Sequence, residues 1–212
     1  MTTSIAGPET PLDAALPVPG GPAAAIDSGR VASLISQLLV ELGEDPAREG
    51  LIGTPDRVAA WWNDFLSPDG SKMATCFTES RLNSQLVIVG GMSVWSLCEH
   101  HMLPMNLQVT AGYVPEGEVV GLSKFGRVAQ HFAARLQVQE RLTRQIAEHL
   151  TGVIGRKDVA VAVRGTHLCM SMRGVRMEDA RTTTVHNGGR FRTDPVLSQQ
   201  FVTLAAAQWN AA

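Results

Sequence analysis

Two separate stretches of the 212-residue chain carry side chains that could hold one metal ion. The first is Cys98-Glu-His-His101, where two residues separate a thiolate from an imidazole, so that one tight turn can aim both at a single ion. This spacing is weak evidence alone, because isolated cysteines and histidines are more often core residues. Cys169 strengthens it by offering a third ligand. Three protein ligands leave the fourth tetrahedral position to water, which is the arrangement of catalytic zinc.

The surroundings of Cys169 suggest an acid beside the metal. We expect Thr166-His-Leu-Cys-Met170 to belong to an extended segment over 167–172. Residues two apart on a strand share a face, so His167 and Cys169 would lie together. One strand could therefore supply both a zinc ligand and a proton donor that titrates near neutral pH.

Three cationic residues are candidates for binding phosphate. In Gly121-Leu-Ser-Lys-Phe-Gly-Arg127, we expect Ser123 to cap a helix with Lys124 and Arg127 near its positive end. Exposed amides, the helix dipole and two cations together favour an anion. An ordinary cap with solvated charges would explain the same residues. Arg173, four residues after Cys169, could add a bidentate phosphate contact.

Gln139 and Glu140 begin a further predicted helix. A carboxylate there is ordinarily a favourable first-turn charge. It can also accept two parallel hydrogen bonds from the N1–H and the exocyclic amine of guanine, which adenine does not offer.

Composition narrows the class of protein. With 44% apolar and 18% charged residues and a formal net charge of -2, the chain is typical of one folded domain without a nucleic-acid-binding surface. Three cysteines cannot all pair, which favours a reducing, cytoplasmic setting. No stretch approaches the roughly 20 apolar residues of a membrane helix. We expect a flexible Pro-, Ala- and Gly-rich tail over 1–27, not a signal peptide.

Periodicity places these residues in an α+β protein. Helical spacing predicts helices over 28–42, 54–66 (with Thr54 as N-cap), 124–135, 138–154 and 195–207. Strands are expected over 85–89, 107–114 and 159–163. We expect an N-terminal helical region over 28–70 and a catalytic domain over 71–212, with long helices covering one face of an antiparallel sheet.

Four motifs together resemble the GTP cyclohydrolase I family, in the same order: CEHH at 98–101, GLSK at 121–124, LQVQERLT at 136–143 and THLCM at 166–170. REGLIGTPDRVA at 49–60 and TTT at 182–184 are similar more weakly. The resemblance implies a tunnelling fold (T-fold), preceded by N-terminal helices. It also implies a homodecamer whose active sites form between neighbouring chains.

The resemblance further implies conversion of GTP and water to 7,8-dihydroneopterin triphosphate and formate. Zn²⁺ would be held by Cys98, His101 and Cys169 and would activate water for attack on C8 of the purine. His167 would protonate N7, while His100 and Ser123 would assist ribose opening and ring closure. The remaining family positions would bind substrate: phosphate at Arg57, Lys124, Arg127 and Arg173, and the guanine edge at Gln139 and Glu140.

Three departures from the family pattern leave alternatives open. Ala60 replaces a lysine, Gly90-Gly91 replaces a charged pair, and Met105-Asn106-Leu107 replaces Phe-x-Gly. The chain could instead be a zinc hydrolase that prefers another guanine nucleotide or stops at a formamide intermediate. The third hypothesis is a catalytically silent T-fold protein that binds a purine or pterin.

Overall fold

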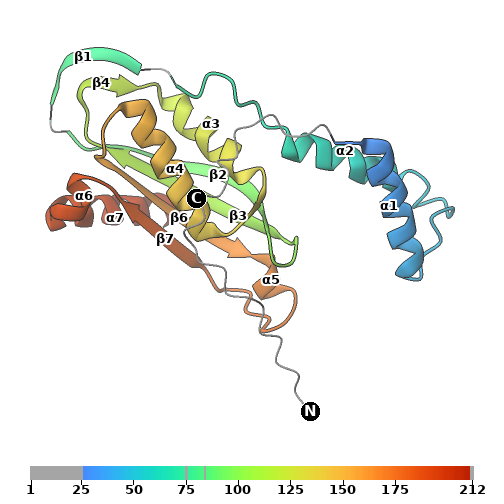
Figure 1. The fold of residues 1–212 in the computed structure, drawn as a ribbon. Helices are drawn as coiled ribbons and strands as arrows, with labels where there is room; N and C mark the ends of the chain where they lie inside the picture. The colour runs from blue at the N-terminus through green and yellow to red at the C-terminus, as the bar shows by residue number, and fades with distance from the viewer. Residues whose placement is uncertain (1–25, 75, 84, 211–212) are drawn as a thin grey trace, which may run out of the picture.

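Two helices precede the sheet. The computed structural model describes residues 26–74, 76–83 and 85–210, so the tail expected over 1–27 lies almost wholly outside the described residues. Helix α1 (Ser28–Glu41) begins after Asp27, whose side chain accepts a hydrogen bond from the Arg30 amide, and Gly43 follows its end with a φ of +82°. Helix α2 (Thr54–Leu66) packs against α1, and the pair lies to one side of the sheet (Figure 1). Both predicted helices are confirmed.

Five strands form the main sheet in the order β5-β2-β3-β6-β7. Their bounds are β5 (Leu136–Gln137), β2 (Val87–Cys98), β3 (Pro104–Tyr113), β6 (Val159–His167) and β7 (Thr182–Asn187). All neighbours pair antiparallel except β5, which runs parallel to β2. Strands β1 (Cys76–Asn83) and β4 (Glu116–Val120) form a separate antiparallel pair. The expected α+β architecture is confirmed.

Helices cover both faces of this sheet, not one face as the sequence had suggested. Helices α3 (Leu122–Ala133) and α4 (Gln139–Ile154) pack on one face, and α7 (Pro195–Asn210) packs on the other (Figure 1). The reason lies in β6, where Val161 and Val163 enter the core under α3 and α4, while Ala160 and Ala162 enter the core under α7. A strand that is apolar on both faces needs cover on both. Within the described ranges, every helix is too short or too polar to cross a bilayer.

Two predicted N-caps are wrong. Helix α2 begins at Thr54 itself and α3 begins at Leu122, so the N-cap residues are Gly53 and Gly121, and no side chain caps either helix. Helix α2 therefore starts at the residue that resembled its cap, and α3 starts one residue before Ser123. Thr54 Oγ1 instead accepts a hydrogen bond from the guanidinium of Arg57 at 2.9 Å.

The Gly90-Gly91 pair has a structural cause. β2 is irregular between Val89 and Met92, and Gly91 there has a φ of +69°, which favours glycine. A Cβ at Gly90 would come within 2.8 Å of Cγ of Gln208 on α7. Packing of β2 against α7 thus explains the glycine at position 90.

Candidate metal centre and active site

The turn between β2 and β3 presents the first two metal-ligand candidates. Its backbone is closed by hydrogen bonds from the Cys98 amide to the Leu103 carbonyl (2.9 Å) and from the Met102 amide to the Cys98 carbonyl (2.7 Å). Met102 has a φ of +54°, in the left-handed region that few residues other than glycine adopt. This tight turn brings the side chains of Cys98 and His101 together, with Sγ and Nδ1 separated by 3.8 Å.

Cys169 reaches the same turn from the end of β6. His167 pairs with Met105 at the start of β3, so β6 ends beside the turn. The strand expected over 167–172 is wrong: β6 stops at His167, and Leu168–Ser171 form the single helical turn α5. Its backbone closes with a hydrogen bond from the Met172 amide to the Leu168 carbonyl at 3.0 Å. Cys169 therefore reaches the β2–β3 turn from a helical turn and not from a strand face.

These three side chains fit a zinc ion. The candidate ligand atoms of Cys98, His101 and Cys169 all lie within 4.8 Å of one another. Tetrahedral zinc, with bonds of about 2.3 Å to sulfur and about 2.0 Å to nitrogen, requires separations of roughly 3.6–3.8 Å between ligand atoms. Burial raises the pKa of the Cys169 thiol, and the nearby Cys98 raises it further. Two thiolates at this separation need a cation between them, and the donor set matches zinc.

His100 and Arg173 flank the cluster. His100 is exposed, and its Nδ1 lies 3.7 Å from Cys98 Sγ. Arg173 places Nη1 2.7 Å from His101 Nε2. An arginine N–H only donates, so Nε2 accepts in this contact. Metal binding through His101 Nδ1 would put the hydrogen on Nε2, so Arg173 would then turn to another acceptor.

Short strand β5 fixes the start of α4 beside the same turn. Gln137 pairs with Cys98, and its carbonyl accepts a hydrogen bond from the Glu99 amide at 3.0 Å. Gln139 follows at the first position of α4, with its Oε1 2.8 Å from His167 Nε2. Burial lowers the pKa of His167, and the charge of Glu140 opposes this shift. The cluster, the candidate acid and the candidate guanine-binding residues thus meet within one chain.

The family model of GTP cyclohydrolase I matches residues 31–206. The chain belongs to the GTP cyclohydrolase I family. It is 42% identical to the GTP cyclohydrolase 1 of Chlorobaculum tepidum over 182 residues, which cover 83% of this chain and 80% of that protein. It is also 42% identical over 179 residues to the GTP cyclohydrolase 1 of a Sulfurihydrogenibium species, covering 84% of this chain and 95% of that relative. The mixed sheet with its packed helices agrees with the T-fold of the family.

Four other residues expected at the site lie elsewhere in the same chain. Ser123 and Lys124 are in the first turn of α3, whereas the last turn of α3 leads into β5 beside the cluster. A helix of 12 residues is about 18 Å long, so the start of α3 is far from the cluster. Arg127 is paired with Asp69 at 3.1 Å, and Arg57 lies on α2. Of the expected phosphate-binding residues, Arg173 lies beside the metal centre of its own chain, whereas Lys124 at the start of α3 lies far from it.

Two residues that sequence reasoning missed brace the turn. The guanidinium of Arg141 on α4 forms an ion pair with the carboxylate of Glu99, and its Nε donates to Gln137 Oε1 at 3.0 Å. This links the ligand-bearing turn to α4. The signal was present, because Glu99 and Arg141 carry opposite charges within two motifs that were expected to meet.

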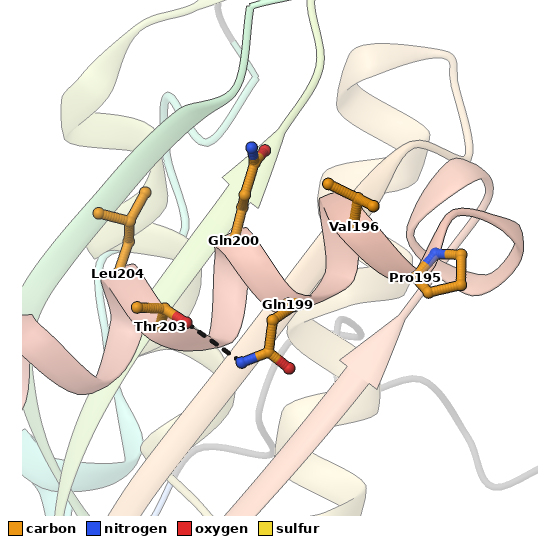
Figure 2. A pocket seen from close by; sticks show the side chains of 6 residues that line it. All are labelled: Pro195, Val196, Gln199, Gln200, Thr203 and Leu204. Carbon is orange, nitrogen blue, oxygen red and sulfur yellow. Dashed lines mark hydrogen bonds between the residues drawn. The ribbon is translucent and has the colours of Figure 1, made fainter.

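A hollow of about 580 Å³ on α7 is not the active site. Figure 2 shows its lining, which consists of Pro195, Val196, Gln199, Gln200, Thr203 and Leu204. Gln199 Nε2 donates to Thr203 Oγ1 at 3.2 Å, and no lining side chain is an acid, a base or a thiol. Its apolar members instead belong to an exposed surface, with Val196 67% and Leu204 48% exposed.

Proposed function

We propose that this protein is a working GTP cyclohydrolase I. The net reaction takes GTP and one water to 7,8-dihydroneopterin triphosphate and formate, with the imidazole ring opened at C8. The observation that carries the proposal is the cluster of Cys98, His101 and Cys169, with His167 at the end of β6 and Glu140 in the first turn of α4. The family and the relatives named GTP cyclohydrolase 1 support the same activity.

The thiolates and the imidazole would hold zinc. When bound there, zinc supplies a Lewis acid that makes water nucleophilic near neutral pH. Cys98 and Cys169 would each bind as a thiolate and contribute a negative charge, and His101 would complete a set of three protein ligands.

His167 is the proposed general acid at N7 of the purine. Its imidazole is half-buried beside the cluster, and imidazole is the side chain whose ordinary proton exchange lies closest to neutral pH. A proton on N7 withdraws electrons from C8 and favours attack there. We propose that His100, which lies on the open side of the cluster, serves the later ribose opening together with Ser123.

Glu140 is the proposed reader of the guanine edge. Its carboxylate is exposed at the start of α4 and close enough to His167 to affect the pKa of that histidine. A carboxylate accepts from both N1–H and the exocyclic amine, a pattern specific to guanine. The same geometry would place the purine between Glu140 and the metal.

The triphosphate site is proposed to come from a neighbouring copy. Lys124 and Arg127 stand on α3 far from their own cluster, while Arg173 stands beside it. A ring of chains can bring the start of one α3 to the metal centre of the next. Exposed apolar residues on α1 and α7 would be covered in such an assembly: Leu34, Leu38, Leu42, Val196 and Leu204. We propose a homodecamer, with Arg57 as a further phosphate ligand.

Mixed oligomers test the shared site. Lys124→Glu and Cys169→Ala chains, each inactive alone, should regain about a quarter of wild-type turnover after co-refolding in equal amounts, because half of the chains meet each requirement. Formate release measures this. Two Cys169→Ala preparations mixed together provide the control. Absence of any recovery in verified mixed oligomers would contradict a site built from two chains.

Nucleotide comparison tests the activity itself. From GTP, zinc-loaded protein should release formate and a pterin that becomes fluorescent on oxidation. Turnover of GDP and GMP should be much lower, because these nucleotides lack phosphate groups that GTP offers to the site. A preference for GDP or GMP, or accumulation of a formamide product, would favour the related hydrolase. Binding without turnover, unaffected by His167→Ala, would favour the silent binding protein.

The proposed setting is the cytoplasm, where GTP is available. Cys76, Cys98 and Cys169 are all free thiols, as a reducing compartment maintains them. The product would enter folate or biopterin synthesis.

A further inference from the structure

The side chain of Gln139 is enclosed and fully hydrogen-bonded within the chain. Only 1% of its surface is exposed. Its Nε2 lies 3.0 Å from the Val163 carbonyl, 3.2 Å from the Thr182 carbonyl and 3.1 Å from Thr184 Oγ1. Its Oε1 lies 2.8 Å from His167 Nε2. The amide that was expected to read guanine is therefore committed to β6, β7 and His167.

These partners decide which way round the amide lies. The two carbonyl oxygens can only accept, so the amide nitrogen must face them, and Oε1 must face His167. Since Oε1 also only accepts, His167 Nε2 has to carry a hydrogen. Nδ1 is therefore the nitrogen that would carry the second proton of an imidazolium ring, and this is the proton that His167 could pass to N7 of the purine while Nε2–H stays bonded to Gln139.

Packing holds the amide in this position. Gly165 provides the space, because a Cβ there would come within 2.6 Å of Gln139 Oε1 and 2.3 Å of Leu107 Cδ2. Thr143 Oγ1 donates to the Gln139 carbonyl at 2.8 Å and lies 2.6 Å from Thr184 Oγ1, so the threonines tie the helix start to β7. The buried network is satisfied throughout and favours one geometry.

We propose that Gln139 is a positioning residue that keeps the hydrogen of His167 on Nε2 and turns Nδ1 toward the substrate. In this assignment Glu140 reads the guanine edge without the Gln139 side chain. The inference rests on the proposed function, because it concerns the acid of that reaction. It changes the role of Gln139 from substrate contact to orientation of a catalytic histidine.

Kinetics of Gln139→Met separate the two roles. Methionine fills similar space but neither accepts from His167 nor donates to the strands. We expect kcat to fall about 10- to 100-fold, a part of the ~10²- to 10⁴-fold that a placed general acid contributes, with KM for GTP within about threefold of wild type. Gln137→Met is the matched control for the tautomer of His167 only, because Gln137 is equally buried (1% exposed) but bonds Phe132, Arg141 and Gln145 instead of His167.

The tautomer gives a readout that needs no turnover. Solid-state NMR of ¹⁵N-histidine-labelled protein should show the neutral His167 ring protonated on Nε2 in wild type and in Gln137→Met, and a mixture of tautomers in Gln139→Met. The signal is assigned by its loss in His167→Gln. Protonation on Nδ1 in wild type, or a rise in KM that matches the fall in kcat, would overturn the proposal. If the wild-type protein were inactive toward GTP, the proposed function would be rejected, whereas the tautomer of His167 measured by NMR would not be affected.

Discussion

Cys169→Ala should lose its zinc and its turnover together. The substitution leaves Cys98 and His101 as a two-ligand site on one turn, and two ligands hold zinc much more weakly than three. Removal of the Lewis acid costs several kcal/mol of transition-state stabilisation, and each 1.36 kcal/mol is tenfold in rate. We therefore expect formate release to fall at least ~10³-fold, with metal content near zero by elemental analysis.

Cys76→Ser is the matched control for this experiment. Cys76 is also a free thiol, but its Sγ donates to the Val153 carbonyl at 3.4 Å and it is not part of the cluster. This variant should keep both zinc and turnover. Full zinc content in Cys169→Ala, or loss of zinc in Cys76→Ser alone, would show that the metal is held elsewhere.

The His167→Gln variant should still bind zinc and GTP but should lose catalytic activity. The ring is beside the cluster without being one of the three ligand candidates, so metal content should be unchanged. Loss of a positioned general acid lowers rates about 10²- to 10⁴-fold, and we expect kcat to fall by this amount. Equilibrium binding of GTP, measured by calorimetry under conditions of slow turnover, should change by less than about threefold.

His186→Gln on β7 tests whether such an effect is specific. His186 is likewise half-buried, and burial lowers its pKa as it does for His167. Its replacement should leave kcat near the wild-type value. Equal losses in the two variants would mean that the His167 effect is structural, and an active His167→Gln would remove this residue from the mechanism.

Sequence reasoning reached most elements that bear the site. Spacing of apolar residues located α3, α4 and α7, because burial of one helix face imposes that period. The residue types in the two motifs also predicted that Cys98, His101 and Cys169 form one ligand set, and the structure places them in one cluster. These features depend on local residue type and spacing, which the sequence displays directly.

Other features depend on contacts between distant segments. The helical turn at Cys169 is too short to show a period, and the second covered face followed only from the alanines of β6 meeting α7. Gln139 was expected to bind the guanine edge from a helix start, yet carbonyls of β6 and β7 enclose its amide. The spacing of residues within α4 does not predict those partners, because they lie 24 or more positions from Gln139 in the sequence.

The place of the expected phosphate-binding residues on α3 could not be predicted from residue spacing. Ser123, Lys124 and Arg127 share one motif, and the sequence placed it beside the metal only through family resemblance. The single chain keeps the start of α3 away from the cluster, so its part in the site depends on an assembly of copies. The mixed-oligomer experiment addresses that step separately from the chemistry.

The fate of the C8 carbon of GTP tests the proposed ring opening most directly. Zinc-loaded protein should be incubated with GTP carrying ¹³C at C8, and the products followed by NMR and mass spectrometry. We expect ¹³C-formate in an amount equal to the pterin, with no label left in the pterin. Label that stays in a nucleotide, or formate that carries none of it, would contradict ring opening at C8 by this site.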